Sequence, residues 1–393
     1  MVTKGTVGRV VSGMRHPFMV ILTVAFLLQF GLGMQRTVWN NFLVEDIQLE
    51  PDQVGYVESV REIPGLLTAA LAAATVGFAK GVLSGLCVLL VSLGLVMYAA
   101  STGLAAIIVA TLTYSVGFHL FYPLQTAQTL ELANHGEKGA KLGRLNSVVV
   151  AASLASMGFV YLLSGALSYR QFLVFAALVA AVGAVVSLAW GQKREADTRK
   201  KVVFRLAYMP YYVLTFLGGS RRQMFNTFAT FSLVRVYGMP VQHMAALLLA
   251  SNVVSLVTRP AMGKLVDVLG ERRILMLNYA VVSVILLAYA RLSNLTLLYV
   301  LYVLDTAMVG FDVAVSTYLD KIAPQADMAP TLAMGSTVNH ISGVLIPTIG
   351  GLLWAGFGHS ATFLAGATIA VATLLYVVLL LKPAEVHLRS IQA

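Results

Sequence analysis

Residues 81–130 read GVLSGLCVLLVSLGLVMYAASTGLAAIIVATLTYSVGFHLFYPLQTAQTL, 50 residues without an Asp, Glu, Lys or Arg. A helical bilayer crossing takes about 20 mostly apolar residues, so this stretch is long enough for two crossings joined by a tight turn at 101–103. Residues 328–381 form a second uncharged stretch, with a turn at 356–360. Neither stretch shows the alternating pattern of a membrane β-barrel. The sequence therefore predicts paired transmembrane helices.

The composition of the whole chain supports a membrane protein. Of 393 residues, 58% are apolar and 11% are charged, whereas a soluble domain carries about 25% charged residues. This excludes a soluble enzyme, and the apolar content excludes a disordered or nucleic-acid-coating protein despite a net charge of +10. The single cysteine, Cys87, excludes a disulfide framework. With no phosphate-binding loop, metal-ligand cluster or nucleophile–base pair, we expect no enzymatic activity and no cofactor.

Apolar runs and charged interruptions together predict an all-α protein with twelve transmembrane spans. The predicted spans start near Phe18, Gly55, Gly81, Leu104, Leu142, Gln171, Leu206, Val241, Ile274, Asn294, Thr331 and Ser360. Residues 1–190 would form one six-helix bundle, 191–205 a cytoplasmic linker and 206–393 a second six-helix bundle.

The distribution of basic residues predicts the orientation. With the N-terminus inside, 20 of the 27 Lys and Arg residues fall on cytoplasmic segments or span ends, as the positive-inside rule requires. We therefore expect a multi-pass protein of a bacterial inner membrane or another plasma membrane, with both termini cytoplasmic. The net positive charge is then explained by the basic residues on the cytoplasmic side of the lipid bilayer, and we expect no nucleic-acid partner.

The two halves of the chain repeat each other. The segment 30–36 with Asn40 matches 216–222 with Asn226 at a register difference of 186, and 116–119 matches 309–312. Spans five and eleven align through two glycine pairs, Gly143 with Gly335 and Gly158 with Gly350. Duplicated helical units with binding sites near the midplane are typical of secondary transporters.

The most specific motif lies between spans eight and nine. It reads Gly263-Lys264-Leu265-Val266-Asp267-Val268-Leu269-Gly270-Glu271-Arg272-Arg273 and resembles the cytoplasmic signature of the major facilitator superfamily. The resemblance implies two pseudo-symmetric six-helix bundles and a gating role for Gly263, Asp267, Gly270, Arg272 and Arg273, with Asp267 near Arg144. The equivalent loop in the first half, 77–85, lacks the Asp and the basic cluster.

Polar residues inside the spans are the candidate site, because intramembrane charges are functional by default. Arg36 with Asn40, and Arg222 with Asn226, are four residues apart and each pair shares a helix face. In the family fold, spans one and seven line the central cavity, so these faces would bind an anionic group through guanidinium. Asn252, Asn339 and His340 are further candidate substrate residues.

Proton coupling or internal ion pairing is expected of a second set. It comprises Glu58, Arg61, Glu62, His119, Asp305 and Asp312. Because four intramembrane Arg residues meet four intramembrane carboxylates, complete pairing within the protein is an alternative to substrate binding. Arg61 is expected to pair with Glu58 or a neighbouring residue. Arg221 is a weaker candidate for substrate binding than Arg222, because it points to a different side of the helix. Trp39, Tyr208, Tyr211 and Tyr212 are interpreted as an interfacial aromatic belt.

These patterns predict a monomeric secondary active transporter that works by alternating access. Its substrate would be a small organic, anionic solute, and a proton or counter-anion gradient would drive it. One alternative is proton-driven efflux of hydrophobic or multidrug compounds, with Glu58, Glu62 and Asp312 facing the cation. A non-transporting membrane sensor is an alternative of another class.

Overall fold

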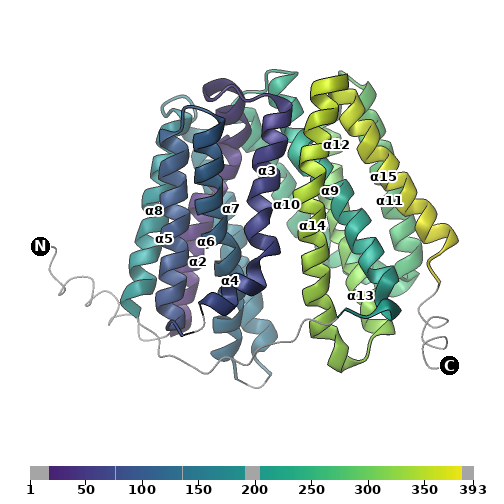
Figure 1. Ribbon diagram of the computed structural model, residues 1–393, viewed down its shortest axis with the longest axis horizontal. Helices are drawn as coiled ribbons and strands as arrows, with labels where there is room; N and C mark the ends of the chain where they lie inside the picture. Colours follow the sequence, from purple (N-terminus) through teal and green to yellow (C-terminus); the bar gives the residue numbers. More distant parts are fainter. Residues whose placement is uncertain (1–16, 76, 135, 191–203, 383–393) are drawn as a thin grey trace, which may run out of the picture. The chain divides into compact units, whose positions relative to one another are not determined.

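The computed structural model describes residues 17–75, 77–134, 136–190 and 204–382 (Figure 1). These residues form helices joined by short connections. Ten of the helices are long and apolar enough to cross a membrane, so the described chain is an all-α membrane protein, as the sequence predicts. The N-terminal 16 residues, most of the predicted linker (191–203) and 383–393 lie outside the described residues.

The helices begin close to the predicted span starts. In chain order they are α2 (Pro17–Asn41) continued by the π-helical η1 (Phe42–Asp46), α3 (Pro51–Leu66), α4 (Thr68–Ala74), α5 (Lys80–Ala100), α6 (Leu104–Glu131), α7 (Lys138–Leu163), α8 (Tyr169–Trp190), the 3-10 turn η2 (Leu206–Tyr208), α9 (Met209–Arg235), α10 (Val241–Leu269), α11 (Glu271–Arg291), α12 (Leu295–Met308), the 3-10 turn η3 (Val309–Asp312), α13 (Val313–Ile322), α14 (Gln325–Phe357) and α15 (His359–Leu379).

Two of the twelve predicted spans are not among the ten apolar helices, and each has a local reason. Span two consists of α3 and α4, which are 16 and 7 residues long and meet at Leu67, shortly after Pro64. Pro64 removes one helical hydrogen bond and weakens the helix around it, and at the break Thr68 Oγ1 donates to the carbonyls of Pro64 and Gly65. Span seven is α9, which is long enough at 27 residues but carries Arg221 and Arg222.

The chain divides into two compact units. Unit 1 comprises 1–49, 63–198 and 240–249, and unit 2 comprises 50–62, 199–239 and 250–393. The start of α3 thus belongs to unit 2 and the start of α10 to unit 1. The division into bundles 1–190 and 206–393 stays a prediction about domain organisation.

Within each unit, helices distant in sequence pack side by side. In unit 1, α2 packs against α7 and α8, and α5 packs against α6 and α8. In unit 2, α9 packs against α14 and α15, and α11 packs against α15 (Figure 1). With little hydrophobic driving force between helices in lipid, such packing depends on small residues that let helices approach closely.

Glycine contacts place the internal repeat in register. In unit 1, a Cβ on Gly33 of α2 would lie 1.9 Å from Ser156 Oγ of α7. In unit 2, a Cβ on Gly219 of α9 would lie 2.7 Å from Ser342 Oγ of α14. Both residues of the second pair follow those of the first by 186 positions, the register predicted from spans one and seven.

The predicted alignment of spans five and eleven through their glycines does not describe equivalent packing. A Cβ on Gly143 or Gly158 would meet open space, whereas one on Gly335 or Gly350 would collide with an aromatic ring. The glycine pairs lie 192 apart, six residues out of the register that the serine contacts define. Ser156 is therefore the structural counterpart of Ser342.

We expect Gly33→Ala to destabilise the chain, because the new methyl group would overlap Ser156 Oγ. Overpacking of this kind costs about 1–3 kcal/mol. Ser156→Gly should restore stability in the double variant, since the remaining neighbour, Ser153 Cα, would lie 3.6 Å away. Thermal unfolding of the purified variants measures both effects. A Gly33→Ala protein as stable as the wild type would contradict the assigned contact.

Span ten is discontinuous at a candidate site residue. The α-helix stops at Met308, a 3-10 turn covers Val309–Asp312, and an α-helix resumes at Val313. The matching segment of the first half, 116–119, stays inside the unbroken α6. Irregular backbone at membrane depth is typical of cavity linings, so the break draws attention to Asp312.

Candidate functional site

Unit 2 contains a cavity of about 320 Å³. Its walls come from α9, α11, η3, α13 and α14. The lining residues are Tyr211, Leu214, Thr215, Gly218, Gly219, Arg222, Tyr279, Asp312, Val315, Ser316, Leu332, Gly335, Ser336 and Asn339. The volume falls at the small end of the range of ligand pockets, which suits a small solute.

The charged centre of this cavity is Arg222. Its Nη1 donates to Asp312 Oδ2 at 2.6 Å, and its Nη2 donates to Asn339 Oδ1 at 2.7 Å. The side chains of Arg222 and Asp312 are 29% and 32% exposed, so both are accessible from the cavity. The structure thus brings together three predicted residues from three different spans.

The neighbouring Arg221 forms a second ion pair in a different environment. Its Nη1 donates to Asp305 Oδ1 at 2.6 Å, and the two side chains are only 1% and 2% exposed. Arg221 Nε is buried and has no hydrogen-bond partner among the described residues. Because no solute reaches this pair, Asp305 is a packing partner of Arg221 here and lies outside the cavity lining.

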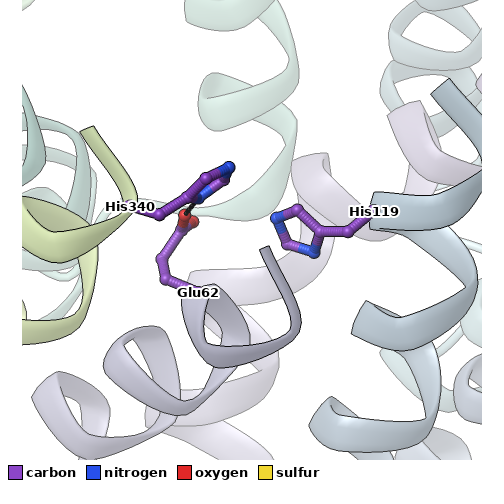
Figure 2. Close-up of side chains that lie close together, drawn as sticks. All are labelled: Glu62, His119 and His340. Atoms are coloured by element: carbon purple, nitrogen blue, oxygen red, sulfur yellow. Dashed lines mark hydrogen bonds and ion pairs between the residues drawn. The ribbon is translucent and has the colours of Figure 1, made fainter. Parts of the chain in front are cut away.

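A further polar cluster joins the start of α3 to α14 within unit 2. Arg61 pairs with Glu58 at 2.9 Å, as its spacing predicts, and with Glu62 at 3.3 Å. Figure 2 shows the Glu62 carboxylate facing the His340 ring, whose Nδ1 is hydrogen-bonded to Glu62 Oε2 at 2.9 Å. His119, also drawn there, belongs to unit 1. Glu62 and His340 are both largely buried.

Gly343 lets these helices approach each other. A Cβ on Gly343 of α14 would lie 2.7 Å from Glu62 Cγ and 3.0 Å from Gln223 Nε2 of α9. One turn further along α14, Thr348 Oγ1 donates to Ser59 Oγ at 2.8 Å. The start of α3 therefore packs closely along α14 through small and polar contacts.

In unit 1, Arg36 is exposed on α2, and no carboxylate of the described residues forms an ion pair with it. Asn40 is half-buried one turn later. His119 of α6 is hydrogen-bonded to Ser115 within its own helix, at 2.9 Å. The predicted convergence of the Arg36 and Arg222 faces concerns two different units and stays a prediction.

Two predicted asparagines lie apart from the cavity lining. Asn226 is exposed on α9, one turn beyond Arg222, and Asn252 is half-buried on α10. Their substrate roles stay predictions. The alternative of complete ion pairing holds for Arg61, Arg221 and Arg222, whereas Arg36 is outside it.

The predicted gating motif joins α10 to α11. Gly270 has φ of +80° and starts α11, a conformation that favours glycine. Arg272 donates to the backbone carbonyls of Val377 and Val378 at the end of α15. Asp267 and Arg273 are exposed, and a Cβ on Gly263 would meet no atom within 4 Å. The predicted proximity of Asp267 to Arg144 concerns both units and stays a prediction.

Sequence reasoning missed two residues of the cavity wall, Tyr211 and Tyr279. Tyr211 was assigned to an interfacial belt, but it is buried and lines the cavity, and Tyr279 was not singled out. Tyr208 is buried too, and its hydroxyl donates to Asp327 at 2.6 Å. Burial and this carboxylate raise the pKa of the Tyr208 phenol to about 12. Their positions on helix faces that turn inward could be found only from the fold.

Comparisons with known proteins agree with this architecture. The Major Facilitator Superfamily model matches residues 211–392. Multidrug resistance protein 2 of Bacillus subtilis (strain 168) is 22% identical over 364 residues, which cover 86% of this chain and 88% of that protein.

Solved structures of transporters share the fold. The nucleoside transporter NupG superposes with a TM-score of 0.76 at 18% identity, covering 92% of this chain and 98% of that chain. A peptide transporter POT in complex with sulfate gives a TM-score of 0.70 at 14% identity, covering 92% and 93%. A bacterial homolog of the human lysosomal transporter Spinster gives 0.67 at 14%, covering 98% and 97%.

The helical fold, the apolar spans and the polar cavity define a multi-pass membrane protein with a site for a polar solute. Its fold is that of the solved transporters, and the second half of its sequence is similar to the Major Facilitator Superfamily.

Proposed function

We propose that the chain carries a small organic anion across the membrane by alternating access, with Arg222 binding the carboxylate or phosphate of the solute. The observation that carries this proposal is the Arg222–Asp312 ion pair, which has a 2.6 Å contact and faces the cavity. Guanidinium offers a planar pair of donors that fits such anions. Asp312 occupies one of these donors in the absence of solute.

Asp312 is the proposed proton carrier. When the solute anion takes the place of Asp312 on Arg222, the aspartate is left without its cationic partner in a partly buried site. An unpaired carboxylate there is stabilised by taking up a proton. Solute and proton would then bind together, because the solute takes the place of Asp312 on Arg222.

Asn339 would hold the second donor of Arg222 in place. Its Oδ1 accepts from Nη2 at 2.7 Å, and this fixes the plane of the guanidinium group relative to the cavity. His340 lies on the same helix, α14, and its contact with Glu62 of α3 supports a further protonation site. If a counter-anion drives transport instead, transport will not depend on the proton gradient.

We expect Asp312→Asn to separate exchange from accumulation. The neutral asparagine leaves Arg222 available to the solute at every pH, so exchange of labelled for unlabelled solute in proteoliposomes should continue. Accumulation driven by a pH gradient should be lost, because the carrier no longer takes up the proton. Asp320→Asn, at an exposed carboxylate of α13 outside the cavity lining, is the matched control. If Asp312→Asn accumulates solute at the wild-type level when driven by a pH gradient, proton transfer at this residue is refuted.

Efflux of hydrophobic or cationic compounds is a second candidate, which the similarity to multidrug resistance protein 2 favours. In that function Asp312 would bind the cation and the tyrosines would contact its apolar part. Transport of a lipophilic cation that survives Arg222→Ala but is lost with Asp312→Asn would support efflux over anion transport.

A further inference from the structure

Tyr279 of α11 has an unusual position in the cavity. The residue is 1% exposed, yet it lines the cavity together with Arg222 and Asp312. Among the described residues its hydroxyl has no hydrogen-bond partner, whereas its backbone carbonyl accepts from Ser283. A buried tyrosine hydroxyl usually finds a partner, so this one is available to a ligand.

Gly218 of α9 leaves the space in which this hydroxyl lies. A Cβ on Gly218 would lie 2.6 Å from Tyr279 Oη, while the next nearest atom, Tyr279 Cζ, would be 3.8 Å away. The absence of a side chain at 218 therefore provides the space that the oxygen occupies. Gly218 lies one turn before Arg222 on α9, and Tyr279 and Arg222 line the same cavity.

Other lining residues add neutral polar groups. Ser316 on α13 and Ser336 on α14 are exposed in the cavity wall. Tyr211 closes another side, with its ring against Gly335, where a Cβ would lie 2.1 Å from its oxygen. The cavity thus combines one cationic centre with several hydroxyl groups.

We propose that Tyr279 is a specificity-determining residue whose hydroxyl bonds a neutral polar group of the solute, so that the substrates are hydroxylated carboxylates such as hydroxy acids or sugar acids. This assignment rests on the proposed function, since the carboxylate is placed by Arg222. A plain aliphatic carboxylate would leave the Tyr279 hydroxyl unpaired, and an unpaired buried polar group is destabilising.

The test compares matched probes on the purified full chain. Gluconate and hexanoate are six-carbon chains that end in a carboxylate. Quinate and cyclohexanecarboxylate are six-membered carbon rings that carry a carboxylate. Within each pair, only the first compound has hydroxyl groups on the other carbons. Affinities come from ligand-dependent thermal shifts. We expect the wild type to prefer the hydroxylated member of at least one pair, and Tyr279→Phe to weaken that member about two- to tenfold, the range of one neutral hydrogen bond. Binding of its deoxy partner should stay unchanged.

Two further variants separate the hydroxyl from general packing. Gly218→Ala should produce the same loss as Tyr279→Phe, because the new methyl group displaces the oxygen. The double variant should be no weaker than Tyr279→Phe alone, since the ring carbon would lie 3.8 Å away. Tyr212→Phe is the matched control, because Tyr212 has a buried, unpartnered hydroxyl outside the cavity lining.

The outcomes also distinguish this assignment from the proposed function. Equal binding of both members in every pair, or an equal loss of both with Tyr279→Phe, overturns the role of Tyr279. If carboxylate binding still depends on Arg222 in that case, the proposed anion transport stands without the role of Tyr279. Carboxylate binding that is unchanged in Arg222→Ala overturns both.

Discussion

Arg222→Ala is expected to lower both uptake and exchange of the transported anion by about 10- to 150-fold. The expected loss corresponds to a hydrogen bond to a charged group, about 1.5–3 kcal/mol. Arg222→Lys should recover part of the activity, because the ammonium keeps the charge but lacks the planar pair of donors. Initial rates in proteoliposomes, at matched protein density, measure the effect.

A control must separate lost binding from lost folding, since the substitution leaves Asp312 without its partner. The double variant Arg222→Ala with Asp312→Asn removes that unpaired charge. It should be as stable as the wild type in thermal unfolding and still fail to transport. Wild-type transport by Arg222→Ala would show that the cavity charge has no part in binding. Arg36→Ala, measured in parallel, tests the predicted second arginine.

The largest effect on stability is expected from Asp305→Ala. Arg221 is 1% exposed and Asp305 is its ion-pair partner, so the substitution leaves a guanidinium charge buried and uncompensated. Breaking a buried pair in this way costs about 3–5 kcal/mol. We expect low yields of folded protein and a much lower unfolding temperature, measured on detergent-solubilised samples.

Removing both charges should reverse that loss. Apolar residues of similar size often replace a buried ion pair without loss of stability, so Arg221→Met with Asp305→Leu should fold. Arg291→Ala, at an exposed basic residue that ends α11, serves as the control for loss of one charge. If Asp305→Ala is as stable as Arg291→Ala, the pair does not hold α12 against α9. Transport by the double variant would further indicate that the pair acts in packing alone.

The spans and the repeat were predictable because both can be recognised directly in the order of the amino acids. The uncharged runs give the helices directly, and the 186-residue register of 30–36 and 216–222 recurs in the contacts Gly33–Ser156 and Gly219–Ser342. The alignment through Gly143 and Gly158 was wrong as a guide to packing, since a glycine's sequence position does not reveal which helix lies against it.

The cavity was only partly predictable. Arg222, Asp312 and Asn339 stood out because charges and amides are rare within spans. Tyr211 and Tyr279 did not, because aromatic residues are common in membrane helices and their roles depend on the helix face that turns inward. The sequence also could not predict that Arg222 pairs with Asp312 and Arg221 with Asp305. These partners depend on how α9 is rotated relative to α12 and η3. Spacing along one chain does not contain that rotation.

Proton uptake on solute binding tests the exchange of Asp312 for a solute anion most directly. The purified chain in weakly buffered detergent solution is mixed with the tightest-binding carboxylate of the probe set, and a pH indicator follows the proton. We predict net uptake that approaches one proton per bound anion in the wild type and none at Asp312→Asn, although that variant still binds. Anion binding without proton uptake in the wild type, or unchanged uptake in Asp312→Asn, would contradict the account.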